Sequence, residues 1–172
     1  MYFCDIIMYH FNITRMTLHL TVKEVKDKAM QWCSRRECCC KDIFDKALSW
    51  GCTSAEAREV VDFLVEQKFI DDRRYTEAFV KDKLRFNKWG RVKIAYMLRA
   101  QDVDKTIVLD ALSEIDETEY KRILTDELQK KHKSLHGSAY EIRGKLFRFA
   151  ASRGFEPEII NEAIDYILIP HS

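Results

Sequence analysis

The strongest constraint on the fold of this chain is an internal repeat. When the sequence is shifted by 51 residues, apolar positions between 43 and 64 fall on apolar positions between 94 and 115. A further shift of 52 residues reaches a third apolar set between 146 and 167. Units of this size are too small to bury an apolar face alone, so they stack in series. The repeat therefore predicts three tandem units that form an elongated, curved, solenoid-like chain.

The composition indicates that these units are helical. The 172 residues include only five Gly and two Pro, fewer than a β-rich fold with many tight turns needs. The matched apolar positions of the first copy follow a helical period: Ile43, Ala47, Cys52, Ala57, Val60, Val61 and Leu64. Helices are expected over 21–36, 41–49 and 54–68, which gives three helices per unit. The predicted class is all-α.

Four segments are expected along the chain. An extension over residues 1–19 is aromatic and apolar without a helical period. Three-helix repeats follow over 20–70, 71–117 and 118–172. The third repeat is about seven residues longer than the second, and Ser, His and Gly collect at 132–139, which predicts the insertion there.

Charge is segregated along the chain although the net charge is only +1. Residues 71–101 hold nine Lys or Arg against four Asp or Glu, and residues 128–155 hold seven against one. Residues 102–127 are acidic, with three against nine. Such segregation suits a surface that meets an anionic or mixed-charge partner.

A cationic stripe lies on the first helix of the second repeat, beside its predicted core face. The core face comprises Tyr75, Ala78, Phe79 and Phe86. The stripe comprises Arg74, Lys81, Arg85 and Lys88. Cations interleaved with aromatic residues are typical of phosphate contact, whereas a solvated charged face is the structural alternative.

No catalytic or cofactor site is predicted. The sequence has no Gly-rich phosphate loop, and its five histidines are scattered over the termini and one expected loop. The carboxylates sit mostly in first turns of helices, where they stabilise the positive end of the helix dipole. We therefore expect no catalytic residue, no cofactor and no enzyme activity.

The six cysteines are interpreted as reduced thiols. The first 17 residues lack the pattern of a secretory signal, and no run reaches the roughly 18 apolar residues that span a bilayer. A cytoplasmic protein without membrane contact is therefore expected. Three adjacent cysteines, Cys38 to Cys40, are unlike the paired spacing of zinc sites, so no metal and no disulfide is predicted there.

Two stretches resemble a known family. FIDDRRYTEAFV, followed by RFNKWGRVKIAYML, resembles the RecX family of regulatory proteins, and WCSRRECCCKDIFDKALSWGC resembles its first repeat. The resemblance covers roughly residues 20–168. It implies three tandem three-helix repeats and a non-enzymatic protein that lies in the groove of the RecA–DNA filament and inhibits strand exchange and ATP hydrolysis. The cysteine triplet and the first 17 residues depart from the family pattern.

The expected partner is thus the RecA recombinase filament, with DNA contacted through phosphates, and the protein is expected to be a monomer. The alternatives are a stand-alone single- or double-stranded DNA-binding module and a helical adaptor for another protein. The candidate contact residues are the cations of the basic segments: Arg35, Arg36, Arg73, Arg74, Lys81, Arg85, Lys88, Arg91, Lys93, Arg99, Lys145 and Arg148.

Overall fold

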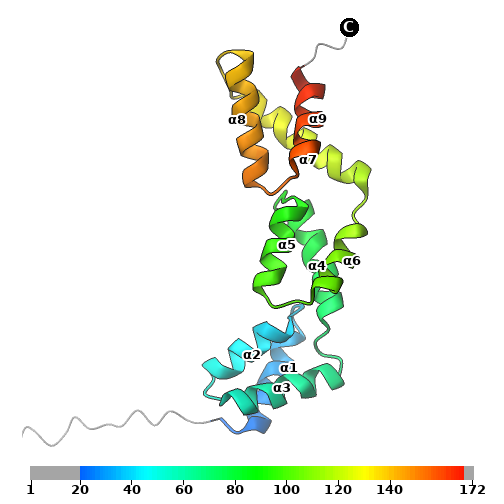
Figure 1. The fold of residues 1–172 in the computed structure, drawn as a ribbon. Coiled ribbons are helices and arrows are strands. Elements are labelled where there is room, and N and C mark those ends of the chain that lie inside the picture. Colours follow the sequence, from blue (N-terminus) through cyan, green and yellow to red (C-terminus); the bar gives the residue numbers. More distant parts are fainter. Residues whose placement is uncertain (1–19, 169–172) are drawn as a thin grey trace, which may run out of the picture.

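The computed structural model describes residues 20–168, and every regular element in this range is an α-helix. The helices are α1 (Val22–Cys33), α2 (Cys40–Ser49), α3 (Ser54–Glu66), α4 (Asp72–Arg85), α5 (Arg91–Ala100), α6 (Lys105–Ser113), α7 (Glu117–His132), α8 (Ala139–Ser152) and α9 (Pro157–Leu168). They form a first unit (α1–α3), a second unit (α4–α6) and a third unit (α7–α9), stacked into an elongated column (Figure 1).

The all-α class and the stacked three-helix units are confirmed. The residue limits given for the repeats stay predictions, and the extension expected at the N-terminus lies outside the described residues. Among residues 20–168, no helix is both long enough and apolar enough to cross a lipid bilayer.

Short polar side chains begin many of the helices. At α3, Thr53 accepts a hydrogen bond from the Glu56 amide at 3.3 Å, and the Glu56 carboxylate accepts one from the Thr53 amide at 2.8 Å. The same reciprocal pair begins α1 at Thr21 and α8 at Ser138. At α4 the Asp71 carboxylate accepts from two amides. These bonds satisfy amide donors that have no partner within the helix.

The three copies of the repeat share one turn, which follows the second helix of each unit. Gly51, Asp102 and Gly154 adopt positive φ angles of 99°, 55° and 84° there. The residue after each donates its amide to the carbonyl five residues earlier, as in Phe155 to Ala150 at 3.3 Å. This left-handed turn is a common way to end a helix. The turn recurs at spacings of 51 and 52 residues. The backbone conformation therefore supports the same alignment of the three units as the apolar positions.

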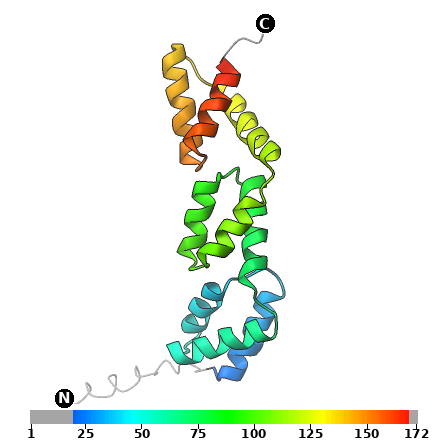
Figure 2. The same ribbon diagram turned by 45° about the vertical axis from the view of Figure 1, so that its right-hand side comes forward.

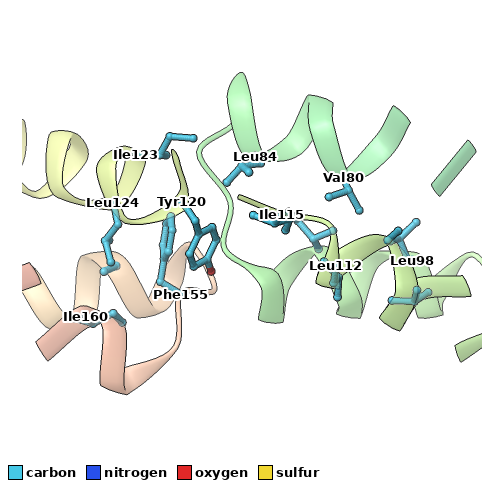
Figure 3. Packing of buried hydrophobic residues seen from close by; sticks show 14 of the residues in the cluster. Val80, Leu84, Leu98, Leu112, Ile115, Tyr120, Ile123, Leu124, Phe155 and Ile160 are labelled. Carbon is cyan, nitrogen blue, oxygen red and sulfur yellow. The ribbon is translucent and has the colours of Figure 1, made fainter. Parts of the chain in front are cut away.

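Two apolar clusters hold the described helices together. One is confined to the first unit and includes Ile43 and Leu64. The other runs through the second and third units. Figure 3 shows Leu84 and Ile115 of the second unit beside Tyr120 of the third unit. The second and third units therefore share one core, to which Cys39 of the first unit also belongs, whereas the other buried apolar residues of the first unit form their own.

Burial follows the repeat closely. Of the twenty-one apolar positions that the two shifts align, eighteen are buried, and Cys52, Val61 and Ile167 are half-buried. The helical period thus identifies most of the core before any tertiary contact is known.

The core face predicted for α4 is wrong at two positions, Ala78 and Phe86, which are both exposed. Phe86 is 80% exposed, and the buried residues of α4 are Tyr75, Thr76, Val80 and Leu84. The helix ends at Arg85, so Phe86 lies beyond the turns that pack on α6. A helical wheel extends the period past this end, and it cannot choose between two adjacent apolar stripes.

The insertion in the third unit falls around the predicted position, where α7 ends and α8 begins, but most of it is helical. α7 has 16 residues against 14 in α4, and α8 has 14 against 10 in α5. The loop between α7 and α8 covers 133–138, only one residue more than the loop over 86–90. Six of the seven extra residues therefore lengthen two packed helices, because antiparallel helices can grow together while a loop between them stays short.

The second and third units meet through backbone hydrogen bonds. The Gly90 amide donates to the Arg153 carbonyl at 2.9 Å, and the Val92 amide donates to the Gly154 carbonyl at 3.0 Å. A Cβ atom at Gly90 would overlap the carbonyl of Gly154. Glycine is therefore required where the N-terminal end of α5 approaches the turn after α8.

The junction between the first and second units uses the equivalent residues but lacks these bonds. The repeat places Cys39 at the position of Gly90 and Gln101 at the position of Arg153. Here the Cys39 thiol donates to the Gln101 side chain at 3.7 Å, and Lys41 pairs with Asp102 at 3.6 Å. A side chain at Cys39 keeps the two backbones apart, so side-chain contacts replace the two backbone hydrogen bonds.

Tyr120 closes the junction between the second and third units. Its hydroxyl accepts from the Arg91 amide at 2.9 Å and donates to the Glu156 carboxylate at 2.5 Å. Burial, together with the bond to Glu156, raises the pKa of Tyr120, so the phenol keeps its proton.

Replacing Tyr120 by Phe should therefore lower the free energy of unfolding by about 1–3 kcal/mol, because the buried Arg91 amide and the Glu156 carboxylate lose their partner. Chemical denaturation measures this. Tyr140→Phe is the matched control, since Tyr140 is 88% exposed and its replacement should leave stability unchanged. Equal stability of the two variants would contradict a structural role for the Tyr120 hydroxyl.

Candidate functional site

The structure divides the twelve predicted contact cations by what each already binds. Four of them form ion pairs inside the chain. Their acidic partners are 26 to 37 residues away in the sequence: Arg73–Asp110 at 3.1 Å, Arg74–Glu37 at 2.8 Å, Arg85–Glu119 at 3.1 Å and Arg91–Glu117 at 2.5 Å. These four residues link helices, and their charges are largely neutralised within the molecule.

The Arg73–Asp110 pair belongs to a repeated structural feature. In each unit the first and third helices are joined by one ion pair across their groove: Lys26–Glu59 at 2.6 Å, Arg73–Asp110 at 3.1 Å and Lys121–Glu162 at 2.7 Å. The three acids lie 51 and 52 residues apart. Exposed pairs of this kind contribute little to stability individually, but they occupy the cation.

Lys81 and Lys88 are the rest of the stripe predicted on α4. Lys81 lines a cavity of about 570 Å³ between α4 and α6, whose rim is predominantly acidic. Lys88 donates to the backbone carbonyl of Arg85 at the end of α4. Arg74, Lys81 and Arg85 thus lie on α4 as predicted, whereas Lys88 lies beyond the end of the helix. Acids from α6, α7 and the first unit contact two of the three cations on the helix.

Arg35 and Arg36 lie in the turn after α1. The Arg36 guanidinium stacks on the Trp32 ring at 4.3 Å, and Lys46 approaches the same ring at 4.3 Å. Cation–π contact holds Arg36 against the first unit.

The last four predicted cations are on α5 and α8: Lys93, Arg99, Lys145 and Arg148. None of these four has an acidic partner within ion-pair distance among residues 20–168, in contrast to the pairs described above. Lys93 stacks on Trp89 at 4.5 Å, and Lys145 donates to the His136 carbonyl at 3.2 Å. α5 and α8 run along the same side of the column in both views (Figures 1 and 2).

Two exposed tyrosines accompany these cations. Tyr96 on α5 is 65% exposed, and Tyr140 on α8 is 88% exposed. Tyr140, Gly144 and Arg148 follow one another at intervals of four residues, so they share one face of α8. Gly144 leaves a hollow of about 550 Å³ between these side chains.

We call the surface formed by Lys93, Tyr96, Arg99, Tyr140, Lys145 and Arg148 the α5–α8 face. Unpaired cations bind phosphate or carboxylate oxygens without first breaking an internal pair, and exposed tyrosine rings stack on bases or pack on apolar side chains. The sequence prediction included all four cations but missed Tyr96 and Tyr140. Their exposure depends on which face of each helix the neighbouring helices cover.

The described part of the chain gives little support to a metal site or to an unfilled polar site. No group of three or more His, Cys, Asp or Glu side chains there is arranged to hold a metal ion. Buried side-chain nitrogen and oxygen atoms all have hydrogen-bond partners within residues 20–168, so none marks an unfilled polar site.

Comparison with protein families gives two matches. Residues 71–112 match the family model "RecX, second three-helix domain", and residues 118–164 match "RecX, third three-helix domain". These segments correspond to the second and third units of the structure.

Curated relatives carry the name "Regulatory protein RecX". The protein from Chlorobium phaeobacteroides is 30% identical over 145 residues, which cover 84% of this chain and 94% of the relative. The protein from Clostridium tetani is 32% identical over 131 residues, covering 74% of this chain and 60% of the relative. The chain thus spans about 60% of the length of the clostridial relatives.

Solved structures have the same fold. The crystal structure of RecX from Lactobacillus salivarius superposes with a TM-score of 0.76 at 20% identity, covering 85% of this chain and 96% of that one. A crystal structure of regulatory protein RecX gives a TM-score of 0.77 at 16% identity, with coverage of 84% and 73%. With two matched domains, relatives at 30% identity or more and a shared fold, the chain belongs to the RecX family of regulatory proteins.

Proposed function

We propose that this protein binds the filament that the RecA recombinase forms on DNA, and that it lowers the recombinase's ATP hydrolysis and strand exchange. The family supports a regulatory role connected with RecA, and DNA repair and recombination are the processes affected. The contact with the filament and its inhibition are our inference for this chain.

The observation that carries the proposal is the α5–α8 face. Four of the other predicted contact cations are paired with internal acids, whereas none of Lys93, Arg99, Lys145 and Arg148 has an acidic partner among residues 20–168. These four residues come from two successive units of an elongated stack (Figure 1). A ligand that repeats along its length, such as a filament, presents acidic or phosphate groups to both units at once.

A second function uses the same face. Four unpaired cations and two exposed tyrosines also suit naked single-stranded or duplex DNA, because base stacking and phosphate contact need no protein partner. Binding that requires the assembled filament favours the first function. Tight binding to free DNA with a steep salt dependence favours the second.

The decisive experiment measures DNA-dependent ATP hydrolysis by the cognate recombinase while this protein is added. We expect the rate to fall as the protein rises toward the concentration of filament subunits, because bound protein blocks cooperative changes along the filament. Free DNA added in excess should not restore the rate. An unchanged rate with demonstrated DNA binding would replace the proposal by the stand-alone DNA-binding function.

A further inference from the structure

Cys33 and Cys38 form a thiol pair at the end of α1. Cys38 is 2% exposed within the apolar cluster of the first unit, and Cys33 is half-buried and packs on the same cluster. Both are free thiols in the structure. The pair bears on the prediction that Cys38 to Cys40 form no disulfide, because Cys33 packs on the same cluster as Cys38.

The backbone holds the two residues together. α1 ends at Cys33, and the Arg36 amide donates back to the Cys33 carbonyl at 3.4 Å. The Cys38 thiol reaches back to the Arg36 carbonyl at 3.7 Å. The chain therefore reverses direction between positions 33 and 38, and the reversal places both thiols on the core side of the loop.

The two thiols differ in reactivity. A hydrogen bond from the Cys38 thiol, with a further contribution from the Arg74 guanidinium, lowers the pKa of Cys33. The same hydrogen bond raises the pKa of Cys38. Burial raises the pKa of Cys39 and of Cys40 to about 12, and it also raises the pKa of Cys52. Among the described cysteines, Cys33 is thus the one favoured as a thiolate, and thiolates are the reactive species.

We propose that Cys33 and Cys38 are a redox modification site that closes reversibly to a disulfide when the protein meets a peroxide or a low-molecular-weight disulfide. The Cys33 thiolate attacks a peroxide oxygen, the O–O bond breaks, and the departing oxygen leaves as water after protonation. The resulting Cys33 sulfenic acid is attacked by the Cys38 sulfur, which forms the S–S bond and releases a second water. The two thiols lose two electrons and two protons in total, and the peroxide is reduced to two waters.

With a small disulfide as oxidant, the Cys33 thiolate first forms a mixed disulfide and releases one small thiol. Cys38 then displaces the second small thiol and completes the same bond. Excess dithiol reverses the reaction in either case.

The site lies in the loop between α1 and α2 of the first unit, which contacts the start of α4 in the second unit. The ring closed by the disulfide contains Arg35, Arg36 and Glu37, and Glu37 pairs with Arg74 of α4 at 2.8 Å. The Cys40 amide also donates to the Asp72 carboxylate at 2.9 Å. The junction between the first and second units lacks the backbone hydrogen bonds that join the second and third units. A covalent ring here therefore acts on the more weakly connected of the two junctions.

Peptide mapping tests the proposal. The full-length reduced protein is treated with hydrogen peroxide or oxidised glutathione, alkylated, digested with trypsin and analysed without reduction. Cleavage after Lys28, Arg35, Arg36 and Lys41 separates Cys33 from the triplet. We expect a disulfide-linked pair of peptides covering 29–35 and 37–41, which disappears on treatment with dithiothreitol.

Single variants assign the bond. The linked pair should be lost in Cys33→Ser and in Cys38→Ser, and it should persist in Cys40→Ser and Cys52→Ser. In Cys38→Ser, Cys33 should accumulate as a sulfenic acid that dimedone traps. Thermal melting of each reduced variant shows that it is folded.

Three results would overturn the proposal: no linked peptides in folded wild-type protein, an undiminished link in Cys38→Ser, or a link in Cys33→Ser through another cysteine. The mapping does not involve RecA or DNA, so its outcome is separate from that of the proposed function.

Discussion

Changing Lys93, Arg99, Lys145 and Arg148 together to Glu should reduce binding to the filament by orders of magnitude while the fold remains intact. Each replacement converts an attraction into a repulsion at the interface. None of the four side chains forms an ion pair among the described residues, and exposed substitutions typically change stability by about 0.5 kcal/mol or less each. Loss of ATPase inhibition, with unchanged thermal melting, is the expected result.

A matched control separates this effect from net charge. Lys23, Arg58, Lys68 and Lys105 are exposed, and none of them belongs to the α5–α8 face. Changing these four to Glu alters the net charge equally and should preserve inhibition. If both quadruple variants lose inhibition to the same extent, overall charge rather than the α5–α8 face is responsible.

The salt dependence adds a quantitative check for DNA. Four phosphate contacts on duplex DNA correspond to a slope of roughly −3.6 in a plot of log affinity against log salt concentration. The quadruple variant of the α5–α8 face should lose this slope. Full inhibition by that variant would instead place the contact surface among the cations of α4.

Replacing Gly90 by Ala should strongly destabilise the fold. The new Cβ would overlap backbone atoms of Gly154 and Phe155, which cannot move aside as a flexible side chain can. The overlap would separate α5 from the turn after α8 and break the amide bonds to Arg153 and Gly154. Overpacking of this kind costs about 3 kcal/mol, which corresponds to a fall in Tm of roughly 6–12 °C at this size.

Gly144→Ala is the matched control for this prediction. Gly144 lies inside α8, and its added Cβ would meet only the end of the flexible Arg148 side chain, at 3.4 Å. Alanine in a helix interior should stabilise the protein by about 0.5–1 kcal/mol relative to glycine. Differential scanning calorimetry should therefore show opposite shifts for the two variants. A Gly90→Ala protein that melts like the wild type would contradict the close backbone contact.

The repeat and the turn residues were sufficient to predict most of the architecture. A period of 51 or 52 residues and the helical spacing of apolar side chains are local properties of the sequence, so positions such as Ile94 and Leu146 could be assigned to the core directly. The turns at Gly51, Asp102 and Gly154 recur at the same spacing, and their helix-ending conformation favours a small set of residue types. The error at Phe86 arose where a local period continued past the end of its helix.

The tertiary structure alone decided which cations are free. Arg85 and Arg99 look alike in the sequence, but the fold brings Glu119 to Arg85 from 34 residues away. Within residues 20–168, Arg99 bonds only to the carbonyl of Ala95 in its own helix. The same holds for the two junctions, where Gly90 and Cys39 occupy equivalent positions, although only Gly90 lets two backbones touch. Local periodicity specifies which face of a helix is buried, whereas charge pairing and contact between units depend on residues that only the folded chain brings together.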